Sequence, residues 1–243
     1  AGHVLFEPWT VATKTGGFYK VFTPMWKSVR GNDVLATLPT PGNLNPPHSW
    51  PQSDGLDDWK MADAMQRGAA ILQSHCTVGE TAAASRLGTF LEDRVMSYQK
   101  NRDLPSVDGT SRLSENLTYG EISPRTCWHA GWRALNDGKA DAEVFLKELV
   151  WREFAYHLAH HTPRIITDNW KEDWDKFPWN TDESVAEVKA WKQGRTGIRF
   201  VDAAMREMYV TGRMHNRGRM IVASYLTKHL LCDWKLGMNW FAD

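Results

Sequence analysis

Apolar residues recur at helical spacing along most of the chain, from about residue 56 onward. Between residues 80 and 100 they stand three or four positions apart, which is the period of one face of an α-helix. These residues are Leu87, Leu91, Val95 and Tyr98. The sequence shows neither the alternation typical of a half-buried strand nor an internal repeat. The pattern therefore predicts an all-α fold.

Capping and turn residues set the expected limits of the central helices. Ser123-Pro124 is typical of a helix start, because a hydroxyl can cap the first turn and proline is tolerated there. Gly138 should close that helix. The next helix is expected at residues 142–161, and Thr162-Pro163 should end it. Its core stripe comprises Leu146, Leu149, Val150, Phe154 and Leu158.

Residues 1–60 lack a regular period and hold most of the prolines. Gly16-Gly17 adds a turn signal to this stretch. A long irregular segment is uncommon inside a compact domain. We therefore expect an interdomain linker over residues 1–60 and a helical domain over residues 61–243.

Composition narrows the class of protein. Hydrophobic residues make up 42% and charged residues 24% of the 243 positions, which is typical of a globular chain. The three cysteines form no Cys-x-x-Cys pair, which favours a reducing compartment such as the cytoplasm. No apolar run approaches the ~20 residues that cross a bilayer, so no membrane partner is expected. The 13 tryptophans could serve as core bulk, base-stacking surfaces or electron carriers.

The last two predicted helices, at residues 200–209 and 215–234, are separated by Gly212 and carry a local positive charge. The whole chain is neutral, with 29 basic and 29 acidic residues. Residues 205–235 nevertheless hold six basic and two acidic side chains. A phosphate-facing patch needs only such a local surplus.

Residues 110–114 place three hydroxyl side chains near a loop-to-helix junction. Unsatisfied backbone N–H groups at such a junction are suited to hold a phosphate. The alternative is that Ser111 or Ser114 simply caps the following helix. The local sequence leaves both interpretations open.

Glu148, Trp151 and Arg152 stand at helical positions i, i+3 and i+4. An acceptor, a flat ring and a cation on one face are the elements that bind a base extruded from DNA. The same spacing is also that of an ordinary Glu–Arg pair on a solvated helix face, with the tryptophan as core bulk.

The segment 214–220 gathers polar, basic and sulfur-containing side chains at a helix start. Asn216 and Met220 share one face, as do His215 and Arg219, so this segment could line a base pocket and contact phosphates. Solvated arginines and a packed methionine are the alternative. The nearby histidines do not predict a metal site, since no carboxylate lies at a matching turn. They are His157, His160 and His161.

Taken in order, several strings resemble the photolyase and cryptochrome family, most closely the photolyases that repair cyclobutane pyrimidine dimers. They are Thr110-Ser-Arg-Leu-Ser114, Glu148-Leu-Val-Trp-Arg-Glu-Phe154, Val201-Asp-Ala-Ala-Met-Arg-Glu207, Met214-His-Asn-Arg217 and residues 219–234. The similarity covers residues 80–243 and more loosely residues 6–30. It implies a helical FAD-binding domain, preceded by the irregular linker.

The resemblance also implies roles for individual residues. FAD would be held by Tyr98, Thr110, Ser111, Arg112, Leu113 and Ser114, with Phe145, Arg152 and Arg219 nearby. Glu148 would bond to the flipped-out dimer, Trp151 would stack on it, and Asn216 and Met220 would line the same pocket. Arg217 would grip the DNA backbone. Trp179 and Trp234 match two members of the family's electron-transfer chain, whereas packing is expected for Trp170, Trp174 and Trp191.

The implied activity is light-driven repair of pyrimidine dimers in damaged DNA, in which excited reduced FAD lends one electron. The complete protein would be a cytoplasmic monomer, associated with the nucleoid in a bacterium. This sequence would be about half of it, without the antenna domain that precedes the linker or the helices that follow residue 243. The family usually has Trp in place of Phe145, and often Trp in place of Arg213.

Two other functions remain open from the sequence. One is a cryptochrome-type photoreceptor that uses the same flavin without repair. The other is a helical DNA-binding fragment without photochemistry. A photolyase for 6–4 photoproducts is disfavoured, because it would carry two adjacent histidines in place of His215-Asn216.

Overall fold

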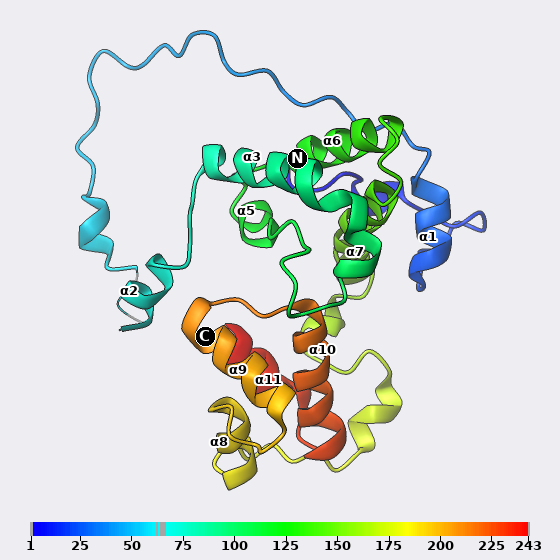
Figure 1. The fold of residues 1–243 in the computed structure, drawn as a ribbon, viewed down its shortest axis with the longest axis vertical. Helices are drawn as coiled ribbons and strands as arrows, with labels where there is room; N and C mark the ends of the chain where they lie inside the picture. Colours follow the sequence, from blue (N-terminus) through cyan, green and yellow to red (C-terminus); the bar gives the residue numbers. More distant parts are fainter. Residues whose placement is uncertain (1, 62, 64–66, 243) are drawn as a thin grey trace. The chain divides into compact units, whose positions relative to one another are not determined.

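The computed structural model describes residues 2–61, 63 and 67–242. The regular elements of these residues are helices (Figure 1). The described residues form no sheet, and one isolated β-bridge joins Asn180 and Cys232. The predicted all-α class is confirmed. The contacts divide the chain into two compact units. Unit 1 comprises residues 1–37, 78–181 and 231–235, and unit 2 comprises residues 38–77, 182–230 and 236–243.

Unit 1 is organised around two packed helices, α6 (Pro124–Asn136) and α7 (Ala142–His161). Ser123 caps α6 as predicted, since its hydroxyl accepts from the backbone N–H of Arg125 at 3.1 Å. Gly138, with φ +89°, follows the helix end. Leu146, Leu149, Val150 and Phe154 of the predicted stripe are buried on α7, and its fifth member, Leu158, is partly buried against the same core. The remaining elements are η1 (Pro8–Thr10), α1 (Phe22–Val29), α3 (Glu80–Thr89), η4 (Phe90–Arg94), η5 (Val95–Ser97), α4 (Tyr98–Asn101), α5 (Ser114–Thr118), η6 (Pro163–Ile166) and η7 (Glu172–Lys176).

The N-terminal part of the expected linker is more ordered than the sequence indicated. Residues 31–55 are irregular, as expected, but α1 is a helix that buries Met25, Trp26 and Val29. Pro24 does not prevent this helix, because the first turn has no intrahelical partner for its N–H groups. Because α1 packs on α7, this helix belongs to the core of the domain. The role of residues 1–60 as a linker stays a prediction.

Unit 2 contains η2 (Leu56–Trp59), α2 (Arg67–Gln73), α8 (Ala186–Lys192), α9 (Arg199–Thr211), α10 (Asn216–Ser224), η8 (Tyr225–His229) and most of α11 (Trp234–Ala242). Trp191 is fully buried at its centre, donates from Nε1 to the carbonyl of Val222 at 3.0 Å, and contacts Phe241. Gly212 closes α9 with φ +69°, as predicted.

The single helix predicted at residues 215–234 is wrong. The chain leaves α10 through the π-helical turn η8, and Leu231 takes a left-handed φ of +53°. The carbonyl of Leu231 accepts from Asn180 N, and Asp233 N donates to the carbonyl of Asn180, each at 2.9 Å. Trp234 therefore begins a new helix, because these two bonds hold residues 231–233 in an extended turn.

Candidate functional site

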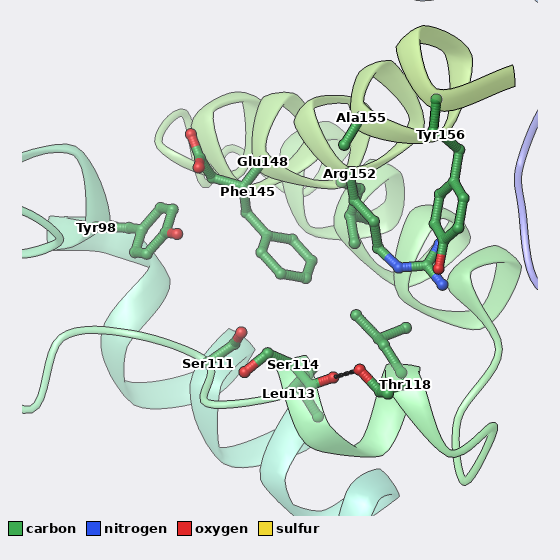
Figure 2. A pocket seen from close by; sticks show the side chains of 13 residues that line it. Tyr98, Ser111, Leu113, Ser114, Thr118, Phe145, Glu148, Arg152, Ala155 and Tyr156 are labelled. Atoms are coloured by element: carbon green, nitrogen blue, oxygen red, sulfur yellow. Dashed lines mark hydrogen bonds between the residues drawn. The ribbon is translucent and has the colours of Figure 1, made fainter. Parts of the chain in front are cut away.

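Unit 1 contains a cavity of about 590 Å³ between one face of α7 and the segment that includes α5 (Figure 2). Ligand pockets are typically of about 300–1,000 Å³ and combine apolar walls with a few polar groups. The lining residues are Tyr98, Ser111, Leu113, Ser114, Leu117, Thr118, Phe145, Glu148, Leu149, Arg152, Ala155, Tyr156 and Ala159. The cavity therefore has the size and the mixed walls of a ligand site.

The α7 wall of the cavity follows the helical repeat. Phe145, Glu148, Arg152 and Tyr156 stand three or four residues apart, so their side chains project from the same side of the helix (Figure 2). The sequence indicated the first three of these residues. It missed Tyr156, although the spacing of four from Arg152 was a usable signal.

Glu148 lies at one end of the cavity, next to a cation from another segment. Arg102 Nη1 donates to Glu148 Oε1 at 2.5 Å, and the Arg102 guanidinium lies 5.8 Å from the centre of the Tyr98 ring. Burial, and then the Glu148 carboxylate, raise the pKa of Tyr98. Tyr98 is therefore a neutral phenol that can donate a hydrogen bond. The sequence offers no local signal for Arg102, since 46 residues separate it from Glu148.

Arg152, at the other end, is held by the N-terminal residues of unit 1. Its Nη1 donates to the carbonyl of His3 at 2.7 Å and to Glu153 Oε1 at 3.2 Å. The guanidinium also lies 4.9 Å from the centre of the Tyr156 ring, and the Tyr156 hydroxyl contacts His3 Nε2 at 2.5 Å. These contacts fix the position of a cation at the cavity wall.

The opposite wall begins at the turn before α5. Arg112 takes a left-handed φ of +51°, and the buried Leu113 precedes the helix. No side chain caps α5, so the alternative in which Ser111 or Ser114 serves as its cap is wrong. Ser111 and Ser114 line the cavity instead (Figure 2). Thr110 and Arg112 belong to the same turn but are not among the lining residues.

A buried network supports this turn from behind. Asn116 is fully buried and accepts from Arg86 Nη1, while its Nδ2 donates to Glu121 Oε2 at 2.6 Å. Arg86 also donates to the carbonyl of Arg112 at 3.4 Å. The network therefore links α3 to the turn and to α5, and neither Arg86 nor Asn116 was indicated by the sequence.

Trp151 is not among the residues that line the cavity. Its ring stacks on that of Phe22, with centroids 3.7 Å apart and planes 5° from parallel, and 46% of the tryptophan remains exposed. Glu148 and Arg152 border the cavity, whereas the ring of Trp151 packs on the first residue of α1. The sequence offered no local signal for Phe22.

The remaining expected substrate residues lie on α10 in unit 2. Asn216 Nδ2 lies 3.8 Å from Met220 Sδ, and Arg217 Nη1 lies 3.3 Å from the same sulfur. Asn216 and Met220 are exposed on a shared face, as their spacing predicted. The Arg219 guanidinium lies 5.9 Å from the centre of the Phe241 ring.

Trp179 and Trp234, the two expected electron-transfer residues, lie in unit 1. Trp179 Nε1 donates to the carbonyl of Trp174 at 3.0 Å, and the centroids of the two rings are 6.0 Å apart. Trp234 Nε1 donates to Asn169 Oδ1 at 3.0 Å. Trp174 and Trp234 both line a second cavity of about 430 Å³. Packing is confirmed for Trp191, but Trp174 is half exposed beside Trp179.

Among the residues that the structure describes, no three His, Cys, Asp or Glu side chains are grouped so that they could hold a metal ion. None of the helices in the same residues combines the length and the apolar character that crossing a membrane requires.

Comparison with known proteins places this helical arrangement in a class of flavin-binding domains. The family described as "FAD binding domain of DNA photolyase" matches residues 145–243. A deoxyribodipyrimidine photo-lyase from Agrobacterium fabrum is 43% identical over the whole chain, which covers 51% of that relative. The chain thus belongs to the DNA photolyase family, and it spans about half the length of the curated relatives it matches.

Solved structures agree with this assignment. A bacterial class III photolyase from Agrobacterium tumefaciens has a TM-score of 0.93 at 43% identity, over 100% of this chain and 50% of that one. A cryptochrome from Synechocystis has a TM-score of 0.74 at 28% identity, over 99% of this chain and 50% of that one.

Proposed function

We propose that the chain supplies the helical part of a deoxyribodipyrimidine photo-lyase, which repairs cyclobutane pyrimidine dimers in DNA. One observation carries the proposal. The cavity of unit 1 brings together residues from distant parts of the chain that the photolyase resemblance assigned to the flavin and the dimer. They are Tyr98, Ser111, Leu113, Ser114, Phe145, Glu148 and Arg152.

The residues of the cavity suit FAD. The apolar side chains of Leu113, Leu117 and Leu149 offer a surface for a flat ring system, and Arg152 offers a charge for phosphate. Ser111 and Ser114 add hydroxyl donors. We therefore assign the FAD phosphates and ribityl chain to Ser111, Ser114 and Arg152, with Phe145 beside the ring. When it is bound, reduced FAD supplies the light-driven electron that opens the cyclobutane ring.

The protein's own groups bind and orient the dimer. Glu148, paired with Arg102, is a carboxylate that accepts hydrogen bonds from the N–H groups of pyrimidines. Trp151 offers a stacking surface, Asn216 and Met220 line the dimer pocket, and Arg217 contacts the DNA backbone. Trp179 and Trp234 carry reducing equivalents toward the flavin. We assign the complete protein to the cytoplasm as a monomer acting on damaged DNA.

The absorption spectrum of the chain after FAD addition and removal of excess cofactor tests this proposal. A retained, structured flavin band is expected, and blue light should then repair a dimer-containing oligonucleotide. A retained flavin without repair would favour the photoreceptor alternative. Failure to retain flavin, or unchanged flavin retention after Arg152→Ala, would count against the assigned cavity.

A further inference from the structure

Phe22 covers one face of Trp151. The two rings are nearly parallel, with planes 5° apart and centroids separated by 3.7 Å. Two rings in this nearly face-to-face contact bury apolar surface against each other, and that burial is favourable. The contact therefore restricts the rotation of the indole about its side-chain bonds.

Phe22 cannot easily leave this position. It is the first residue of α1, and that helix buries Met25, Trp26 and Val29 in the core of unit 1. The preceding segment is tied to α7 as well, since Tyr19 N donates to His157 Nε2 at 3.0 Å. A residue anchored on both sides holds its neighbour in place and is not a plug that a ligand would push aside.

Phe154, the other aromatic neighbour of Trp151, does not cover the second face of the indole. The centroid of the Phe154 ring lies 5.8 Å from that of Trp151 and 6.1 Å from that of Phe22. Because these distances are nearly equal, Phe154 lies beside the stack and not over the free face of the indole. The exposed 46% of Trp151 is consistent with a face that solvent reaches.

We infer that Phe22 is a positioning residue, which holds the indole of Trp151 as a rigid platform for a planar pyrimidine on its free face. The inference rests on the proposed function, in which Trp151 stacks on the dimer. Base–aromatic stacking accepts any base, because every base has a flat face. It is stronger on a ring of fixed orientation, since a mobile side chain loses conformational entropy on binding. Phe22 removes most of that loss before the DNA arrives.

Binding of a fluorescent dimer-containing oligonucleotide by the flavin-loaded chain tests the inference. Phe22→Leu keeps an apolar side chain but removes the flat ring, and it should weaken binding by about three- to tenfold. Phe22→Tyr should bind like the parent. In a Trp151→Ala background, Phe22→Leu should have no further effect, because the platform is already gone.

Two controls separate positioning from general stability. Val29→Ala removes buried volume from the same helix, and it should lower the melting temperature without changing the affinity. The near-ultraviolet circular dichroism due to Trp151, taken as the difference from Trp151→Phe, should be lost in Phe22→Leu and kept in Phe22→Tyr.

The failures are distinguishable. Parental affinity of Phe22→Leu, with weak binding by Trp151→Ala, would overturn the role of Phe22 and leave the proposed function standing. Parental affinity of Trp151→Ala would overturn the stacking assignment and this inference together. If the parent chain binds no damaged DNA, the proposed function fails. An unchanged circular dichroism signal of Trp151 in Phe22→Leu would overturn the inference by itself.

Discussion

The carboxylate of Glu153 accepts a hydrogen bond from the backbone N–H of Leu5 at 2.7 Å, although 148 positions separate the two residues. The same oxygen accepts from Phe6 N at 3.2 Å, and Arg152 lies beside the second oxygen. Only 2% of Glu153 is exposed. A buried acid of α7 thus fastens the N-terminal residues of unit 1 and holds the cavity's arginine.

The burial of Glu153 makes stability depend on pH. Burial raises the pKa of Glu153 to about 7, against the hydrogen bonds and Arg152, which lower it. Because the folded-state pKa exceeds the unfolded one, the stabilising contribution is complete below about pH 4.5 and is lost as the pH rises through 7. We expect the free energy of unfolding to fall by on the order of 3 kcal/mol over this range.

Urea unfolding of Glu153→Gln between pH 4.5 and 8 measures this contribution. The free energy of unfolding of the variant should lack the fall that Glu153 causes over this pH range. Glu143→Gln, on the exposed side of the same helix, should keep the parental pH profile. An identical pH dependence of the free energy of unfolding in the parent and in Glu153→Gln would show that another group titrates.

Gly131→Ala should destabilise unit 1 and disturb the cavity. An added Cβ would lie 2.8 Å from Leu146 Cδ2 and 3.2 Å from Phe145 Cδ1, and Leu146 is fully buried. Overpacking costs about 1–3 kcal/mol, which exceeds the gain in helix propensity of roughly 1 kcal/mol. Gly88→Ala is the matched control, since its Cβ meets nothing within 4 Å, and it should raise the melting temperature. Equal effects of both substitutions would contradict the close helix packing.

Asn116→Ala should weaken cofactor binding without touching the cofactor site. The substitution removes one hydrogen-bond partner from Arg86 and one from Glu121 Oε2, and the loss of a partner by a part-buried polar group costs about 1–3 kcal/mol. The turn at residues 111–114 then loses its support, so flavin retention should fall. Asn136→Ala, on the exposed end of α6, serves as the control. If Asn116→Ala retains flavin as well as the parent does, the network does not support cofactor binding.

Glu148→Ala should lower the repair yield per absorbed photon while the flavin stays bound. A hydrogen bond to a charged group contributes about 1.5–3 kcal/mol, so affinity for the dimer should fall roughly tenfold or more. Glu143→Ala, which leaves the cavity lining intact, provides the comparison. An unchanged repair yield at saturating DNA would sink the assignment of Glu148.

Asp202 should make unit 2 sensitive to acid. Burial alone would raise its pKa, but hydrogen bonds from Thr196 and Gly197 outweigh burial and lower it. The carboxylate accepts from Thr196 N at 2.7 Å and from Gly197 N at 3.0 Å. Its stabilising contribution is therefore present above about pH 4 and is lost as the pH falls through the lowered pKa. Circular dichroism of Asp202→Asn between pH 2 and 5 should show a weaker pH dependence than the parent.

Helix limits were readable from the sequence where they depend on neighbouring residues. The helix at residues 142–161 matches α7 in full, and Ser123, Gly138 and Gly212 act at the predicted ends. Periodicity and capping are short-range effects, so the chain displays them directly. The α7 wall of the cavity could be predicted for the same reason, since its residues repeat every three or four positions.

Long-range partners were not readable in this way. The break at Leu231 depends on Asn180, the support of the cavity turn on Arg86, and the charge beside Glu148 on Arg102. No local pattern indicates such pairs, because their contribution to the free energy of folding arises only when distant segments meet and exclude water.

The sequence by itself determined the helical class, the limits of α6 and α7, the end of α9 at Gly212, and the family motifs that indicate a flavin and a pyrimidine dimer. Only the tertiary structure decided that α1 packs on α7, that Trp151 stacks on Phe22, and that Glu153 fastens residues 5 and 6. Helical periodicity specifies which side chains share a face of a helix. The orientation of that face depends on packing between segments, which the folded chain alone establishes.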